Sequence, residues 1–176
     1  LGIIEEEMKR LYTMANGILN LTKVENQSIL TNVTEYNLSE QIRLTVLLLE
    51  SKWTARNINM NIDFGEYTIS ANEEMMKQVW INLLDNAIKF SPDGEEISIR
   101  ISNKNEHIYV SIYGKGPHIE DEEINKIFRK FYQSDSSHST EGTGIGLALV
   151  SRIIELHKGR IEVNSDKNIN TFTVIL

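Results

Sequence analysis

The chain has 176 residues, of which 40% are hydrophobic and 24% charged, a balance that predicts one globular domain, or one domain with an extra element. Its net charge of −7 argues against binding to nucleic acid or to an anionic membrane surface. The absence of cysteine excludes disulfides and thiolate metal sites, and no apolar run approaches the length of a membrane-spanning helix.

Residues 3–25 form the first predicted helix. Its apolar residues recur at alternating spacings of four and three, namely Ile4, Met8, Leu11, Ala15 and Ile18. Such a seam needs a partner helix, so we expect a dimerisation or bundle helix. The alternative is an ordinary helix packed on its own domain. Because the chain starts inside this helix, we expect it to be part of a longer protein.

Short elements follow up to residue 70. A strand is predicted over 33–38, and then a helix with Ser39 as its N-cap that continues to about Arg56. Alternating apolar residues predict two further strands, at 58–62 and 67–69, on either side of a turn at Gly65.

A central helix is predicted to start after the N-cap Asn72 and to stop just past Phe90, because Pro92 cannot continue it. Asn82, Asn86 and Lys89 are spaced four and three apart, so they share one face. An amide oxygen can ligate Mg²⁺, an ammonium can contact phosphate, and the ring of Phe90 can lie against a nucleobase. A solvated amphipathic face is the alternative. The opposite face is apolar: Met76, Val79, Leu83, Leu84, Ala87 and Ile88.

The C-terminal half alternates strands and helices. It comprises a hairpin over 97–112 with its turn at 103–105, a short helix over 122–132, a helix that ends at a left-handed C-cap, Gly159, and a strand pair at 161–163 and 172–176. The predicted fold is an α+β two-layer sandwich, with a mixed, mostly antiparallel sheet on about three helices, preceded by one long helix.

Three glycines at 142, 144 and 146 expose backbone N–H groups at the start of the last helix, where an anion is stabilised. A tight turn is the commoner explanation of such a cluster. In combination with the amide–lysine helix and a strand end at Gly114 and Gly116, however, the pattern predicts a nucleotide under a lid, which we expect to be poorly ordered over 133–141 in the free protein.

These motifs resemble the catalytic, ATP-binding region of bacterial two-component sensor histidine kinases, whose Bergerat (GHKL) fold is shared with the DNA gyrase, Hsp90 and MutL ATPases. Residues 82–92 are similar to the N box of that family, 127–135 to its F box and 141–159 to its G2 box, and 114–118 occupy the G1 position. The resemblance implies a hairpin helix over residues 1–30, without the phosphoacceptor histidine, and a catalytic domain over 31–176.

The resemblance also implies site roles. Asn86 would ligate Mg²⁺, with Asn82 near the phosphates; Lys89 would approach phosphate, and Phe90 would flank adenine. Lys130 replaces a common phosphate-contacting arginine and loses its bidentate fork. The triphosphate would be lined by Gly142, Thr143, Gly144, Gly146 and Leu147, and the G1 segment would contribute Gly114 and Gly116.

Two departures from the family pattern stand out. Gly114 takes the place of the aspartate that accepts a hydrogen bond from the adenine amino group, and His118 takes the place of a hinge glycine. In addition, we interpret all four histidines (His107, His118, His138 and His157) as surface or lid residues of the ATP-binding domain. Because none of them is the phosphoacceptor, the fragment is expected to be inactive alone.

The resemblance implies an ATP-dependent histidine kinase that passes the γ-phosphoryl group to a histidine for relay to a response-regulator aspartate. It would be a homodimer through the leading helix, in a cytoplasmic domain attached to a membrane only through segments upstream. The amide of Asn82 stands where the related ATPases have a water-activating glutamate, which favours kinase over hydrolase. The alternative is a pseudokinase with impaired nucleotide binding that acts as a dimerising signalling module.

Overall fold

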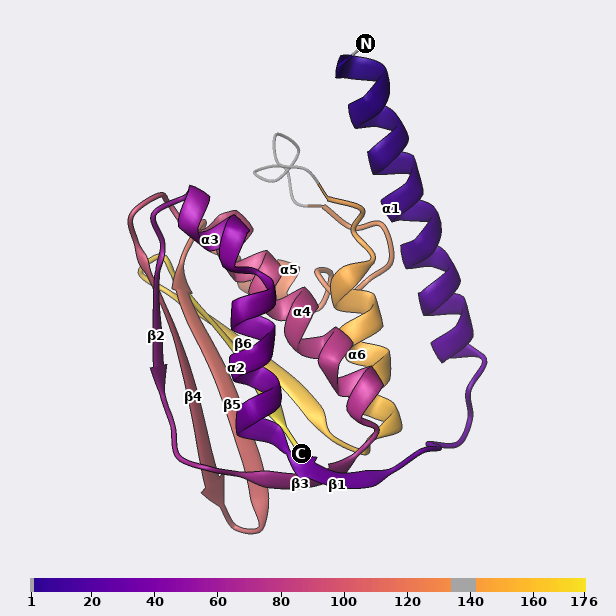
Figure 1. Cartoon of the computed structure of the whole chain (residues 1–176), viewed down its shortest axis with the longest axis vertical. Coiled ribbons are helices and arrows are strands. Elements are labelled where there is room, and N and C mark those ends of the chain that lie inside the picture. Colours follow the sequence, from indigo (N-terminus) through magenta and orange to yellow (C-terminus); the bar gives the residue numbers. More distant parts are fainter. Residues whose placement is uncertain (1, 134–141) are drawn as a thin grey trace.

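The computed structural model describes residues 2–133 and 142–176, and it consists of a helical layer packed on one face of a sheet (Figure 1). The lid predicted over 133–141 falls almost wholly outside these residues. The five-stranded sheet has the order β2-β4-β5-β7-β6, with β2 parallel to β4 and the other neighbours antiparallel. The predicted α+β sandwich with a mostly antiparallel sheet is confirmed.

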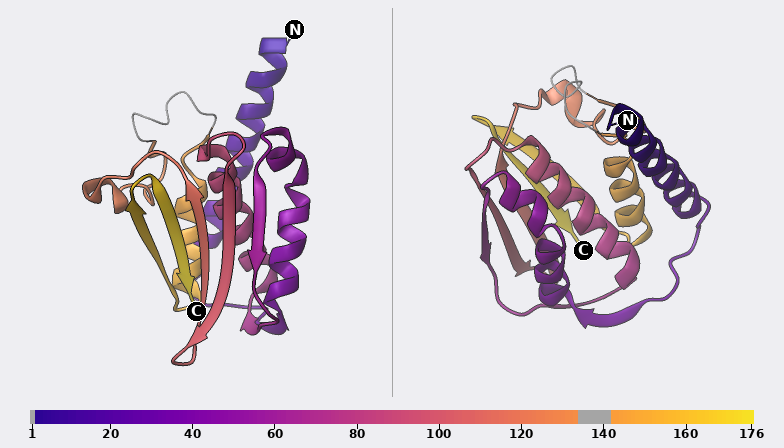
Figure 2. Two further views of the ribbon diagram at one scale, coloured as in Figure 1. Left: turned by 90° about the vertical axis from the view of Figure 1, so that its left-hand side faces the viewer. Right: turned by 45° about the horizontal axis from the view of Figure 1, so that its top comes forward.

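The strands of this sheet are β2 (Asn59–Asp63), β4 (Glu96–Lys104), β5 (His107–Lys115), β6 (Arg160–Asp166) and β7 (Ile169–Ile175). A second, two-stranded sheet pairs β1 (Thr34–Asn37) with β3 (Thr68–Ala71). The helices are α1 (Gly2–Glu25), α2 (Leu38–Leu48), α3 (Glu50–Ala55), α4 (Glu73–Phe90), α5 (Asp121–Ile124) and α6 (Gly146–Leu156). The right-hand view of Figure 2 shows α4 and α6 side by side, with α1 outside α6, and the left-hand view shows these helices behind the sheet.

Helix α4 forms the centre of the core. Asn72 caps it as predicted, since its side-chain oxygen accepts from the N–H of Met75 at 3.0 Å. Met76, Val79 and Trp80 are fully buried, and so are Ile97 and Ile99 of β4 in the same core. The helix ends at Phe90, because Ser91 before Pro92 has extended backbone angles, as predicted. The helix is therefore fixed on its apolar face, and its polar face is left for other contacts.

Several local predictions were wrong. Asn37, and not Ser39, caps the second helix, because the Asn37 side chain accepts from Glu40 N–H while the Ser39 hydroxyl donates to Gly65 O. That helix is also divided in two at Leu49. The helix predicted over 122–132 is only Asp121–Ile124.

The C-cap predicted at Gly159 was also wrong. The left-handed residue is Lys158, with φ of 58°. Gly159 follows it where the carbonyl of Ile175 leaves no room for a side chain. The turn of the β4–β5 hairpin lies at Asn105 and Glu106, both with positive φ, one residue later than expected.

Helix α1 packs on α6 by one face and leaves the predicted seam exposed. Gly17 lies against Ile145, where an added Cβ would be 3.5 Å from the Ile145 side chain, and Leu21 and Val24 are buried. The ammonium of Lys130 pairs with Glu25 at 2.6 Å. The seam residues Ile4, Met8 and Leu11 are each more than 60% exposed. The dimerisation role of this helix and the domain boundary near residue 30 stay predictions. Within the described residues, no helix is both long and apolar enough to cross a membrane.

His157 is a structural residue and not the surface residue that we expected. Its Nε2 accepts from the N–H of Asn72 at 3.1 Å, and its Nδ1 lies 2.7 Å from the carbonyl of Ile153. These two contacts fit the neutral ring with the proton on Nδ1. Burial lowers the pKa of His157, because the charged imidazolium is poorly solvated there. The ring thereby joins the end of α6 to the N-cap of α4.

We expect the free energy of unfolding to fall on acidification because of His157. A histidine whose pKa is lowered in the folded state contributes fully above its unfolded pKa of about 6.5, and that contribution is lost as the pH falls below it. Urea unfolding at about pH 7.5 and about pH 5.5 measures this. His157→Gln should reduce the pH dependence, whereas the exposed His107→Gln should retain it. An unchanged slope in His157→Gln would contradict the assignment.

Candidate nucleotide site

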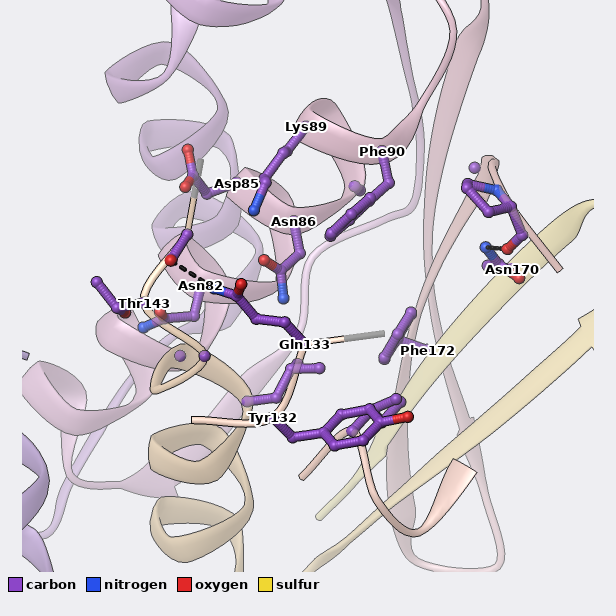
Figure 3. Close-up of a pocket in the computed structure, with 18 of the residues that line it drawn as sticks. Asn82, Asp85, Asn86, Lys89, Phe90, Tyr132, Gln133, Thr143, Asn170 and Phe172 are labelled. Carbon is purple, nitrogen blue, oxygen red and sulfur yellow. Dashed lines mark hydrogen bonds between the residues drawn. The ribbon is translucent and has the colours of Figure 1, made fainter. Parts of the chain in front are cut away.

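A cavity of about 670 Å³ lies between the polar face of α4, the end of β5 and the start of α6 (Figure 3). It also reaches α1, from which Lys9 and Arg10 contribute to its lining. Its volume is within the range of small-molecule and cofactor sites. Ten of the twelve predicted site residues line it: Asn82, Asn86, Lys89, Phe90, Gly114, Gly142, Thr143, Gly144, Gly146 and Leu147.

The end of α4 is held firmly, which fixes the side chains that it presents. The guanidinium of Arg56 donates to the carbonyls of Ile88 and Lys89 and to the carboxylate of Asp93. Lys89 places its ammonium 4.8 Å from the centre of the Phe90 ring, a cation–π contact. The cation, the amide of Asn86 and the aromatic ring are therefore presented together from one helix end.

The glycine segment crosses directly against this face. Gly144 has a φ of 66°, and its carbonyl accepts from the N–H of Phe131 at 2.9 Å. A Cβ at Gly146 would lie 2.6 Å from Oδ1 of Asn82, so the two elements are in contact. Gln133 donates from Nε2 to the Gly142 carbonyl at 2.6 Å. Two motifs some 60 residues apart in the sequence thus form the two walls of one cavity.

The other end of the cavity is lined by apolar side chains. Phe90 in α4, Ile112 in β5 and Phe172 in β7 contribute to it, and Tyr132 completes it with its hydroxyl donating to Glu123 at 2.6 Å. Ile112 and Phe172 are cross-strand partners. One end of the cavity is therefore apolar, and the other presents a cation, an amide and bare backbone. This arrangement suits a ligand with a flat ring and a polyanionic tail.

Comparison with known proteins agrees with this geometry. Residues 71–176 match the family model described as histidine kinase-, DNA gyrase B-, and HSP90-like ATPase. The chain belongs to this ATPase family. The predicted resemblance to the catalytic, ATP-binding domain of sensor histidine kinases is confirmed, and ATP is the nucleotide for which this type of domain is built.

Relatives extend the similarity over nearly the whole chain. The sensor histidine kinase CusS of Escherichia coli O6:H1 is 29% identical over 97% of this chain and 36% of its own length. The adaptive-response sensory kinase SasA of Prochlorococcus marinus is 32% identical over 93% of this chain and 44% of its own. A solved structure of the histidine kinase ThkA with the response regulator TrrA superposes with a TM-score of 0.81 at 29% identity, over 99% of this chain and 49% of that one. The chain therefore spans less than half of these relatives.

Two predicted residues of the ATPase domain do not line the cavity. Gly116 is buried beside it, where its N–H donates to the Asn168 carbonyl at 2.9 Å. Lys130 is instead paired with Glu25 of α1. Both binding roles stay predictions. His118 does line the cavity, although the side chain is exposed, and its Nδ1 lies 2.9 Å from the hydroxyl of Ser165.

Sequence reasoning missed several lining residues. Ile112 could have been found, since strand alternation sets it on the same face as the cavity-lining Gly114 of the same strand. No local signal marked Phe172, Asn170, Tyr132 or the α1 cations, because their placement depends on sheet register, on the packing of distant segments and on the docking of α1.

The residues fit a cation that arrives with a polyphosphate better than a resident metal. Within 2–133 and 142–176, no three His, Asp or Glu side chains are grouped so that they could hold a metal ion. Asn86 contributes one amide to the cavity wall, and its oxygen is a hard ligand of the kind that Mg²⁺ accepts. Mg²⁺ typically takes few protein ligands and several phosphate oxygens.

Proposed function

We propose that this chain binds Mg·ATP and transfers the γ-phosphoryl group to a histidine of a dimerisation helix hairpin, for relay to an aspartate of a response regulator. The observation that carries the proposal is the shared cavity between the Asn82–Asn86–Lys89 face and the glycine segment from Gly142 to Gly146. It is supported by the sensor-kinase relatives.

Each wall of the cavity has a proposed task. Phe90, Ile112 and Phe172 bury the adenine ring, while Lys89 and the backbone N–H groups of the glycine segment hold phosphate oxygens. Asn86 ligates the Mg²⁺ that accompanies ATP, and this ion neutralises charge between the phosphates. Phosphoryl transfer needs mainly such positioning and charge stabilisation. Asn82 offers no base for water, which favours transfer over hydrolysis.

The acceptor and the partners lie in other segments or chains. All four histidines of this chain follow residue 106, in the ATP-binding part, so the phosphoacceptor comes from a hairpin outside this sequence. The structure of ThkA with TrrA supports a response regulator as the next acceptor. The exposed seam of α1 supports pairing with a second copy. The proposal places this domain in the cytoplasmic region of a membrane-anchored sensor.

Calorimetric titration of the purified chain is the direct test. We expect saturable binding of ATP that strengthens when Mg²⁺ is added. Asn86→Ala should remove most of the strengthening, a loss of about tenfold or more, because it deletes the proposed ligand of the ion. Asn164→Ala, on the exposed part of β6, is the matched control and should bind as the wild type does. Absence of Mg·ATP binding at millimolar nucleotide would defeat the enzyme proposal for this chain.

Gly114 favours a second candidate function, a signalling module that pairs helices and binds nucleotide poorly. A glycine offers no side-chain acceptor at the base end of the cavity. A folded wild-type chain without nucleotide binding, but with concentration-dependent association through α1, would support this alternative.

A further inference from the structure

The base end of the cavity contains an amide that the binding proposal above does not use. In the ladder between β5 and β7, Gly114 is paired with Asn170. Asn170 is itself part of the cavity lining. In Figure 3 it lies beyond Phe90 and Phe172, at the far end of the cavity from Asn82 and Thr143. The polar side chain of Asn170 therefore lies on the strand next to Gly114, and Gly114 has no side-chain acceptor.

The Asn170 amide is held in one orientation by its neighbours. Its Nδ2 donates to the carbonyl of Pro117 at 2.9 Å, and its Oδ1 accepts from the Ser165 hydroxyl at 2.7 Å. Exchanging the amide O and N would place two oxygens together at Pro117 and lose this bond. Because a carbonyl oxygen accepts two hydrogen bonds, Oδ1 retains one acceptor position besides the bond from Ser165.

The same arrangement uses the hydrogen and both acceptor positions of the Ser165 hydroxyl. It accepts from the N–H of Ile119 at 3.0 Å, and His118 Nδ1 lies 2.9 Å away. A serine hydroxyl has one hydrogen, and if this hydrogen goes to Asn170 the histidine must donate to the serine. The network therefore fixes Oδ1 as the acceptor atom of Asn170, a residue that lines the cavity.

The ammonium of Lys115, which also lines the cavity, is a donor paired with Glu95. The Tyr132 hydroxyl uses its hydrogen on Glu123. We propose that Asn170 is the specificity-determining residue that accepts a hydrogen bond from the 6-amino group of adenine, in place of a carboxylate at Gly114. This inference rests on the proposed nucleotide binding, and it assigns recognition of the base to a residue in β7.

The test compares ATP with purine riboside triphosphate, which lacks the 6-amino group, by calorimetry on the wild type and Asn170→Ala. One hydrogen bond to a neutral partner corresponds to about a three- to tenfold change in affinity. The wild type should prefer ATP by this factor. Asn170→Ala should weaken ATP binding by the same factor and leave the analogue unchanged, so that the preference disappears.

Two further variants separate base reading from support of the loop at Pro117. Asn170→Asp keeps an acceptor and removes the donor to Pro117, and it should retain the preference for ATP. Thr171→Ala, the next residue on β7 and outside the cavity lining, should retain it as well. Equal weakening of both nucleotides by Asn170→Ala would mean a structural role and would overturn the inference.

The titrations of the wild type with the two nucleotides already test the inference, independently of the variants. If the wild type binds both nucleotides equally, no residue recognises the 6-amino group. The assignment to Asn170 is then wrong, although the proposed nucleotide binding is retained. If the wild type binds neither, the proposed function fails, and the inference fails with it.

Discussion

Replacing Gly144 with alanine is expected to weaken Mg·ATP binding at least tenfold and to destabilise the fold. Gly144 has a φ of 66°, and a Cβ there would lie 2.8 Å from the Phe131 backbone and 2.9 Å from the Tyr132 carbonyl oxygen. The left-handed conformation costs a residue with a side chain about 1–2 kcal/mol, and overpacking about 1–3 kcal/mol more. Backbone atoms cannot rotate aside, so the glycine segment must shift relative to Phe131 and Tyr132, which changes the cavity wall that it forms.

Gly94→Ala provides the matched control for this substitution. Gly94 also has a positive φ, 79°, but a Cβ there would meet nothing within 4 Å. Gly94→Ala should lose about 1–2 kcal/mol of stability and no affinity for ATP, since it has the backbone strain without the steric clash. Thermal unfolding and ATP titration of both variants measure the two effects. A Gly144→Ala protein that binds Mg·ATP like the wild type would show that the segment does not hold phosphate.

The elements that carry the site were predictable because their signals are local. Asn72, the four- and three-residue spacing of Asn82, Asn86 and Lys89, and Pro92 together determine where α4 begins, which face it presents and where it ends. The glycines before α6 were equally visible. That these two elements meet was inferred from their combination with the strand end at Gly114 and Gly116, and then from the family resemblance, and the structure brings them into contact.

What was missed depends on interactions between distant parts of the chain. Phe131 takes a positive φ of 62° because its N–H bonds to the Gly144 carbonyl, and this bond replaces the helix predicted through Tyr132. Likewise, the strand order that sets β7 beside β5 follows from packing and not from alternation within a strand. The pairing of Asn170 with Gly114 could therefore not be deduced from either segment alone.

Replacing Gly114 with aspartate is expected to raise the affinity for ATP about ten- to hundredfold. A hydrogen bond to a charged group contributes about 1.5–3 kcal/mol, and about 1.4 kcal/mol corresponds to a factor of ten. A Cβ at Gly114 would lie 3.1 Å from Oγ of Ser91 and 3.6 Å from Cγ1 of Ile97, so the serine hydroxyl must yield by a few tenths of an ångström. The position lines the cavity, where a carboxylate can accept from the amino group of adenine.

Companion variants show whether the gain comes from the charge, the acceptor or the added bulk. Gly114→Ala adds the Cβ without an acceptor and should give no gain, and Gly114→Asn adds a neutral acceptor and should give about three- to tenfold. With purine riboside triphosphate, Gly114→Asp should bind no better than the wild type, because the analogue has no amino group to donate. Adding Asn170→Ala to Gly114→Asp should weaken ATP binding by about the same factor as in the wild type, since the amino group has two hydrogens and each residue would accept one of them. If Gly114→Asp folds and improves neither ATP binding nor base preference, adenine does not lie at this end of the cavity, and the orientation of the nucleotide must be reversed.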